Sequence, residues 1–193
     1  FFFNILKQKK MSCDLTIGRL EPCKNSVGGI KHVYFIDFKD VGSWTVAATD
    51  AITGMSKADG VTTANAYKYE LKGGNNLEQT ITSSRENGTT FVESTLTMVL
   101  KKQDAATHKE MKLLAWARPF AIIEDYNGNF FLMGKDNGAE VTTTAISTGT
   151  AMGDLSGYTV TMTSQEKLPC NFIDSTDEAD MATDLGITIV SGT

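Results

Sequence analysis

Residues 91–101 decide the fold, and they read Phe91-Val92-Glu93-Ser94-Thr95-Leu96-Thr97-Met98-Val99-Leu100-Lys101. Apolar side chains recur at even positions, namely Val92, Leu96, Met98 and Leu100. Glu93, Thr95 and Thr97 lie between them. Successive side chains of a β-strand point to opposite faces. The stretch therefore predicts a long strand with one buried face and one polar face.

The same alternation continues on both sides of this strand. Residues 77–83 carry Leu77, Gln79 and Ile81 on one side and Glu78, Thr80 and Thr82 on the other. Short runs rich in β-branched and aromatic residues, separated by turn residues, predict further strands. These runs are 32–38, 44–48, 67–71, 120–126, 130–133, 139–147 and 158–168.

One helix is predicted over residues 104–118. Asp104 is a suitable N-cap, Met111 and Leu114 form an apolar stripe, and Pro119 ends the helix. Strands in meander order with one helix are typical of a mainly β domain. We expect an antiparallel β-sandwich or barrel of two packed sheets with one flanking α-helix, formed by residues 31–173.

Three segments stand outside this pattern. Residues 1–30 are predicted to be an N-terminal arm, and residues 1–10, before Met11, are interpreted as a non-native extension or as an arm that orders on a partner. Residues 50–66 contain few large apolar side chains and are predicted to be a long exposed loop or loose hairpin. Residues 174–193 are predicted to be an acidic tail, with a short strand possible over 186–190.

Charge and hydropathy exclude several classes of protein. The chain of 193 residues has 18 basic and 23 acidic residues, and this balance argues against a basic nucleic-acid reader. No segment approaches the roughly 20 apolar residues of a membrane span, so no membrane anchor is predicted. Cys13, Cys23 and Cys170 match no zinc or redox spacing; free thiols are favoured over a Cys13–Cys23 bridge.

The candidate catalytic and metal-binding residues are few. His32 and His108 have no Cys or His neighbours at ligand spacing. Glu124 and Asp125 are interpreted as the solvated end of a hairpin rather than as an acid–base pair. Paired carboxylates must be buried to act as general acid and general base. We therefore predict no catalytic residues, no metal ligands, no cofactor and no enzymatic activity.

Threonines recur at every second position in four strands, as at Thr80/Thr82, Thr95/Thr97, Thr142/Thr144 and Thr159/Thr161/Thr163. Each run places its hydroxyls on one face. Three interpretations are open. The hydroxyls could form the solvent-exposed side of an amphipathic sheet, an ice-binding surface, or a weakly acidic face that does not bind a polyanion moving past it. Glu78 and Glu93 fall on the same faces as these threonines, and the irregular spacing of the runs disfavours ice binding.

Residues 120–172 also follow a recognisable order of turns and strands. An Asn127-Gly128-Asn129 hairpin precedes the turn DNGAEV (136–141) and the segment STGTAMGDLSGYTVTMTSQE (147–166). This order resembles the C-terminal half of phage major tail tube proteins. The opening MSCDLTIGRLEPCKNSVGGIKHVYFIDF (11–38) resembles the same family more loosely.

The resemblance implies a virion structural protein assembled in the host bacterial cytoplasm. Six copies would form a ring by pairing sheets edge to edge. Rings would stack into a hollow tube that contacts other tail proteins and lets DNA pass without sequence-specific binding. The lumen would be lined by Glu78, Thr80, Thr82, Glu93, Thr95 and Thr97. Contacts between rings would come from Ile52, Met55, Lys57, Asp59 and Val61, and the helix would lie outside.

Two other functions remain open from the sequence. The first is a tube subunit of another contractile injection system. The second is a stand-alone β-sandwich that binds carbohydrate or protein through Trp44 or Tyr158.

Overall fold

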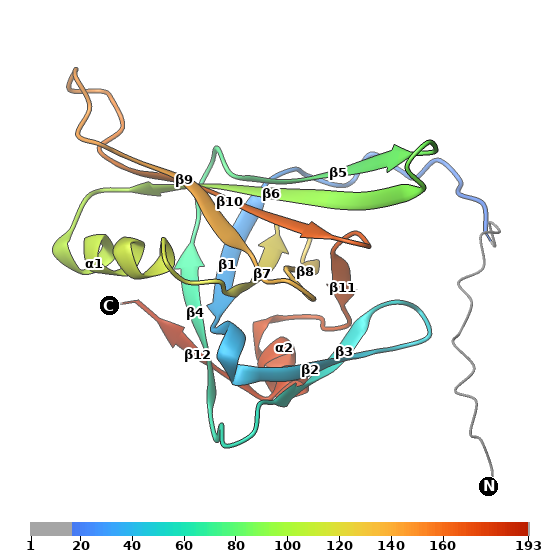
Figure 1. Ribbon diagram of the computed structural model, residues 1–193. Coiled ribbons are helices and arrows are strands. Elements are labelled where there is room, and N and C mark those ends of the chain that lie inside the picture. The colour runs from blue at the N-terminus through green and yellow to red at the C-terminus, as the bar shows by residue number, and fades with distance from the viewer. Residues whose placement is uncertain (1–16, 193) are drawn as a thin grey trace, which may run out of the picture.

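The computed structural model describes residues 17–192, which form two β-sheets and two α-helices within that range (Figure 1). The strand order of the larger sheet is β12-β4-β1-β7-β8-β11-β3-β2, and that of the smaller sheet is β5-β6-β10-β9. The larger sheet comprises β1 (Ile30–Ile36), β2 (Val41–Val46), β3 (Ile52–Lys57), β4 (Ala64–Glu70), β7 (Phe120–Asp125), β8 (Phe130–Met133), β11 (Asn171–Ile173) and β12 (Ile187–Ser191). The smaller sheet comprises β5 (Asn76–Ser84), β6 (Thr89–Lys101), β9 (Glu140–Ser147) and β10 (Gly157–Glu166).

The first core fills the space between the two sheets. Leu96 and Met98 of β6 and Val160 and Met162 of β10 are fully buried in it, as the alternation of these strands predicts. The opposing wall is the odd-numbered face of β1, with Val33 and Phe35. Each side chain of this size stabilises the fold by roughly 1.5–3 kcal/mol when it is fully buried.

Helix α1 (Ala105–Leu114) closes one end of the first core. The carboxylate of Asp104 accepts a hydrogen bond of 2.8 Å from the backbone N–H of Thr107, which confirms Asp104 as the N-cap. Met111 and Leu114 are buried in the first core, as their spacing predicts. The predicted β-sandwich with a flanking helix is confirmed, and neither sheet closes on itself among the described strands.

The prediction for residues 174–193 is right about the short strand expected over 186–190, which is β12 (Ile187–Ser191), but it missed a helix. Residues 174–191 contain a second helix, α2 (Glu178–Leu185), followed by β12, which pairs in parallel with β4. Met181 and Leu185 lie one helical turn apart and are both buried, so they anchor the helix despite its acidic outer face. A second parallel contact joins β11 to β3, so the larger sheet is mixed rather than antiparallel.

Helix α2 covers a second core on the other face of the larger sheet (Figure 1). This core contains Tyr34, Ile36, Ile52, Phe120, Ile122, Phe130, Leu132, Met181, Leu185 and Ile187. The smaller sheet, the larger sheet and α2 are therefore stacked in that order, and the β3–β2 end of the larger sheet also borders the second core. Because the larger sheet is covered on both faces, β7 and β8 are apolar at nearly every position.

The prediction that residues 50–66 form one long loop is also wrong. Residues 52–57 form β3, which pairs with β2 outside this range, so the loose hairpin expected as an alternative within residues 50–66 is not formed either. Ile52 is fully buried in the second core, and β4 begins at Ala64. The apolar signal of β3 is weak because the strand is Gly- and Ser-containing and only Ile52 is fully enclosed.

The proposals about the start of the chain fall on residues 1–16, outside the described range. These are the interpretation of residues 1–10, Met11 as a start, and the state of Cys13. No helix among the described residues combines the length and the apolar character needed to cross a membrane.

Candidate functional site

Most outward side chains of the smaller sheet are polar, and this surface is here called the threonine face; Phe91, Val99 and Ala145 are its apolar members. Strand pairing sets the outward side chains in rows across the sheet: Thr97 lies opposite Asn76 and Thr161, and Thr161 lies opposite Thr143. The next rows place Glu78 and Thr163 beside Thr95, and Thr80 and Gln165 beside Glu93. The six residues predicted for a lumen, namely Glu78, Thr80, Thr82, Glu93, Thr95 and Thr97, therefore share one face of one sheet.

The charge of the threonine face is weakly negative. Its carboxylates are Glu78 and Glu93, with Glu140 at the edge, and Gln165 donates a hydrogen bond of 2.9 Å to Glu93. Within the described part of β5, β6, β9 and β10, the basic residue is Lys101, at the end of β6.

Both edges of the smaller sheet are free in the described chain. They are β5 and β9, and neither strand contains Pro, Lys or Arg, the residues that commonly block edge pairing. All three pairings in the sheet are antiparallel, so the two edge strands run in opposite directions. A second sheet of this kind could therefore continue the antiparallel order at either edge.

The residues predicted for contacts between rings do not form one exposed loop. Ile52 cannot contact another subunit, because its side chain is fully enclosed in the second core. Met55 packs against the same core, and Lys57 donates a hydrogen bond of 2.9 Å to the carbonyl oxygen of Thr62. Asp59 is exposed and Val61 is half-buried, in the connection between β3 and β4.

A group of six charged and polar side chains lies where β1, β4, β7 and α2 meet. We call it the ion cluster, and it comprises Lys31, His32, Tyr34, Lys68, Glu124 and Glu178. Glu124 is only 5% exposed, and it accepts hydrogen bonds from Lys31 Nζ at 2.7 Å and His32 Nδ1 at 2.6 Å. Glu178 pairs with Lys68, and the Tyr34 hydroxyl lies 2.9 Å from Oε2 of both glutamates. The expectation that Glu124 is solvated is therefore wrong.

The environment of the ion cluster keeps its glutamates ionised. Burial acts to raise the pKa of Glu124, but hydrogen bonds from Lys31, His32 and Tyr34 outweigh it and hold that pKa below its ordinary value. The pKa of Glu178 is lowered in the same way, against burial, by Lys68 and Tyr34. Burial and then the two carboxylates raise the pKa of Tyr34, so its hydroxyl stays protonated and acts as a donor.

The ion cluster contains the donor set of a metal site, but both of its carboxylates are already paired with lysines. His32 Nδ1 and one oxygen each of Glu124 and Glu178 lie within 4.8 Å of one another, which is close enough to share an ion. However, Lys31 and Lys68 supply one positive charge to each carboxylate. A divalent cation would have to displace both ammonium groups, so the geometry favours an internal ion-pair network that attaches α2 to the sheet.

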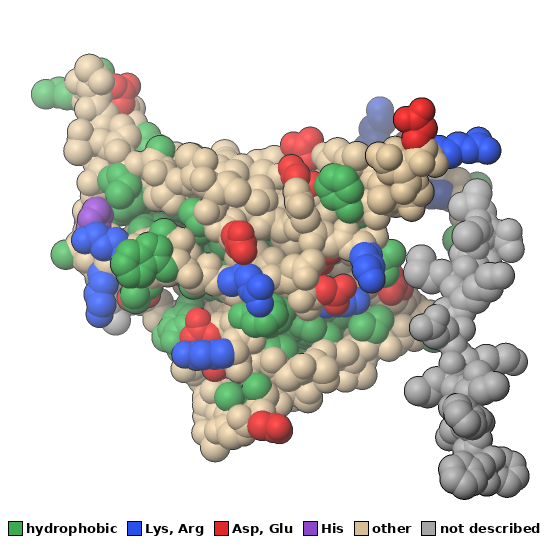
Figure 2. Space-filling view, viewed as in Figure 1, with side chains coloured by type: hydrophobic (Ala, Val, Ile, Leu, Met, Phe, Trp, Pro, Cys, Tyr) green, Lys and Arg blue, Asp and Glu red, His purple; other side chains and the backbone are tan. Residues whose placement is uncertain are grey.

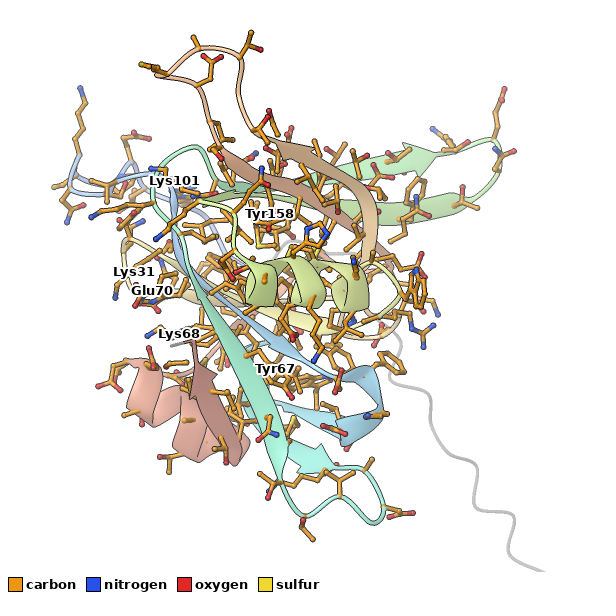
Figure 3. All side chains as sticks on the ribbon, turned by 90° about the vertical axis from the view of Figure 1, so that its left-hand side faces the viewer. Lys31, Tyr67, Lys68, Glu70, Lys101 and Tyr158 are labelled. Carbon is orange, nitrogen blue, oxygen red and sulfur yellow. The ribbon has the colours of Figure 1, made fainter. Side chains whose placement is uncertain are left out.

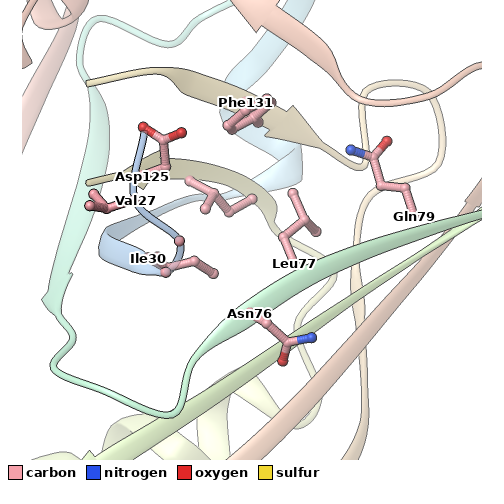
Figure 4. Close-up of a pocket in the computed structure, with 10 residues that line it drawn as sticks. Val27, Ile30, Asn76, Leu77, Gln79, Asp125 and Phe131 are labelled. Atoms are coloured by element: carbon pink, nitrogen blue, oxygen red, sulfur yellow. The ribbon is translucent and has the colours of Figure 1, made fainter. Parts of the chain in front are cut away.

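A cavity of about 250 Å³ opens where β5 diverges from β7 and β8 (Figure 4). Its walls are mainly apolar and include Ile30, Leu77, Ile123 and Phe131. Asp125 is the titratable residue that lines it, and its carboxylate accepts hydrogen bonds from the backbone N–H groups of Asn127 and Asn129. Asp125 thus stabilises the hairpin turn, and consecutive positions on β7 direct it and Glu124 to opposite faces.

The aromatic residues considered for carbohydrate binding are not exposed platforms. Tyr158 is fully buried, and its hydroxyl donates to the carbonyl oxygen of Asp104 at 3.2 Å. Trp44 is half-buried, packs edge-on against Phe120, and has a buried Nε1 without an acceptor among the described residues. Cys170 is buried too, and this burial raises the pKa of its thiol to about 11.

The chain matches no protein-family model, no curated protein and no solved structure. Its function is therefore inferred from its own residues and geometry.

Proposed function

We propose that the chain is a structural subunit of a phage tail tube, which forms stacked six-membered rings around a hollow conduit for DNA. The observation that carries this proposal is the threonine face, a polar sheet surface bounded by two free edges of opposite direction. The proposal makes the chain a non-catalytic virion component that is assembled in the host bacterial cytoplasm.

The strand directions support closure into a ring. Adding β9 of one copy to β5 of the next would keep the antiparallel order across the boundary, since the two edges run oppositely. Such a contact is heterologous, and it closes when the rotation between copies divides a full turn. Closure would also bury both edge strands. These strands carry no Pro, Lys or Arg that would prevent uncontrolled pairing with other chains.

The chemistry of the threonine face supports passage of DNA without capture. Tight binding to nucleic acid needs clustered Lys and Arg that release counterions from phosphates. The face instead presents hydroxyl groups together with Glu78 and Glu93, which repel phosphates weakly. We propose that these residues, with Thr80, Thr82, Thr95 and Thr97, face the lumen.

The two alternatives share parts of this reasoning. A tube subunit of another contractile injection system would use the same sheet and edges, and only the particle in which it is found would differ. The carbohydrate-binding alternative depends on Tyr158 and Trp44, but Tyr158 is buried and Trp44 packs against Phe120. Neither side chain therefore offers an exposed platform, which weighs against carbohydrate binding through these two residues.

Electron microscopy of the purified protein at rising concentration tests the proposal. We expect rings and hollow tubes, and a protein that sediments as a monomer at every concentration would overturn it. Thr80→Lys/Thr82→Lys on the edge strand β5 should hinder ring formation, because lysines disfavour edge pairing. Thr161→Lys/Thr163→Lys on the central strand β10 is the matched control and should still assemble.

A further inference from the structure

Helix α1 carries an outward stripe that the fold of a single copy does not use. Lys109, Lys112, Leu113 and Trp116 follow one another at helical spacing, and we call them the α1 stripe. The N–H of Trp116 bonds to the carbonyl oxygen of Leu113 at 3.1 Å, so the turn continues past the helix end. The stripe lies opposite Met111 and Leu114, which face the first core.

The apolar part of the α1 stripe is unusually exposed. Trp116 is 92% exposed and Leu113 is 53% exposed. A tryptophan so exposed, beside a second large apolar residue, is typical of a protein contact rather than of an isolated surface residue. Figure 3 looks onto this side of the molecule, where α1 lies in front, with Lys101 above it and Tyr67 below it.

The surroundings of the stripe are basic in an acidic protein. Residues 101–118 contain five basic and two acidic residues, although the whole chain has a net charge of −5. Lys109 and Lys112 are exposed, and neither is paired with a carboxylate within residues 17–192. The lysines at the left of Figure 2 lie beside green apolar side chains in this region.

The opposite charge is concentrated in residues 174–184, here called the acidic segment. It contains five acidic residues and no basic residue. Glu178 is paired with Lys68, whereas Asp174, Asp177, Asp180 and Asp184 have no ion-pair partner in the described chain. Figure 1 places α1 and α2 on different sides of one copy, so the two charged regions cannot neutralise each other within it.

We propose that the α1 stripe docks a second copy of this chain on its acidic segment, with Trp116 at the centre of the contact. Charge complementarity between the two regions selects this partner. The contact is heterologous, and it rests on the proposed assembly of identical subunits. Burial of the indole supplies the affinity, and the charges fix the orientation and make the contact sensitive to salt.

Tryptophan fluorescence tests the contact directly. The chain has two tryptophans, so Trp44→Phe leaves Trp116 as the single reporter. We expect its emission to shift to the blue as concentration rises and assemblies form, because the indole leaves water. Rings or tubes that form with no shift would overturn this contact and leave the tube proposal standing. Absence of any assembly would instead overturn the tube proposal.

Reciprocal charge reversal tests the partner. Lys109→Glu/Lys112→Glu and, separately, Asp174→Lys/Asp184→Lys should each raise the concentration needed for assembly by about tenfold or more. The two sets combined should restore it to within about threefold of the original protein. Lys24→Glu/Lys167→Glu, on exposed lysines elsewhere, is the control and should assemble normally.

Two results of the reversal would contradict the inference. Assembly of the α1 variant at the original concentration would exclude the stripe from the contact. Loss of assembly without rescue by the combined variant would exclude the acidic segment as its partner. Circular dichroism of each variant distinguishes loss of docking from loss of folding. A blue shift with anionic vesicles but not with rising protein concentration would assign the stripe to a membrane surface and overturn the proposal.

Discussion

The hydroxyl of Tyr34 on β1 lies 2.9 Å from Oε2 of Glu178 on α2, although the two residues are 144 positions apart in the chain. The same hydroxyl lies 2.9 Å from Oε2 of Glu124. A phenol has one proton, so it can donate to one carboxylate at a time, and the lysines and His32 satisfy the rest. Tyr34 therefore joins the sheet to the helix that covers the second core.

Tyr34→Phe removes this shared donor while keeping the ring. We expect the free energy of unfolding to fall by about 1–3 kcal/mol, because two partly buried carboxylates lose a hydrogen-bond partner. Urea denaturation measures the change. Tyr126→Phe, at an exposed site, is the control and should leave stability nearly unchanged. Equal stability of the Tyr34→Phe variant and the original protein would show that the hydroxyl does not hold α2.

Acid should weaken the fold through Glu124 and Glu178. Both pKa values are lowered below the ordinary 4.5, so the folded state binds protons less readily than the unfolded chain. Their stabilising contribution is complete above pH 4.5 and is lost as the pH falls through the lowered values. Unfolding measured between pH 7 and pH 3 should show this decline.

Glu178→Gln provides the comparison for the acid experiment. It should lower the stability at neutral pH, because Lys68 loses its partner. It should also reduce the loss of stability that occurs as the pH falls. Glu86→Gln, at the exposed β5–β6 turn, should leave the acid profile unchanged. An acid profile of the Glu178→Gln variant parallel to that of the original protein would contradict the role given to Glu178.

Gly157 allows the strands β6 and β10 to approach closely. A Cβ atom at this position would lie 2.1 Å from the carbonyl oxygen of Leu100, and backbone cannot move aside cheaply. Gly157→Ala should therefore destabilise the protein by about 2 kcal/mol or more. Gly153→Ala is the matched control, since nothing lies within 4 Å of its Cβ. Thermal unfolding that shows equal midpoints for both variants would refute the close approach.

The negative charge of the threonine face should control whether assembled tubes retain DNA. Glu93→Lys, on the central strand β6 and so away from the pairing edges, makes the face attract phosphate, and we expect the assembled tubes to retain DNA in a salt-dependent way. Filter binding at low and high salt measures the retention. Glu86→Lys, in the β5–β6 turn rather than on the face, is the control. Equal retention by both variants would argue against a lumenal position for this face.

Local signals made the smaller sheet and α1 predictable from the sequence. Alternation in β6 sets the buried positions of Leu96 and Met98, and the Asp104 cap needs only residues three positions away. Helix α2 was missed because its acidic residues outnumber its two anchors, Met181 and Leu185, which are buried only by strands distant in sequence. Short strands such as β3 are likewise stabilised by partners that the local pattern does not specify.

The ion cluster illustrates the limit of local reasoning about a site. His32 and Glu124 are 92 positions apart, and they meet because β1 and β7 pair in a register that places them opposite each other. One signal was available: each is a polar residue in a mostly apolar strand. The positions of Lys68 and Glu178 depend on the parallel docking of β12 and the position of α2, which pairing rules for neighbouring strands do not supply.

The position of α2 in the sequence has a consequence for how the protein is made. The second core contains Tyr34 and Ile36 from β1, but Met181, Leu185 and Ile187 are synthesised long after them. Until then, one face of the larger sheet and the outer side of β4 remain uncovered. A nascent chain that ends at Ile173 would expose an apolar surface that invites chaperones. Synthesis past Ile187 therefore controls when the second core can close.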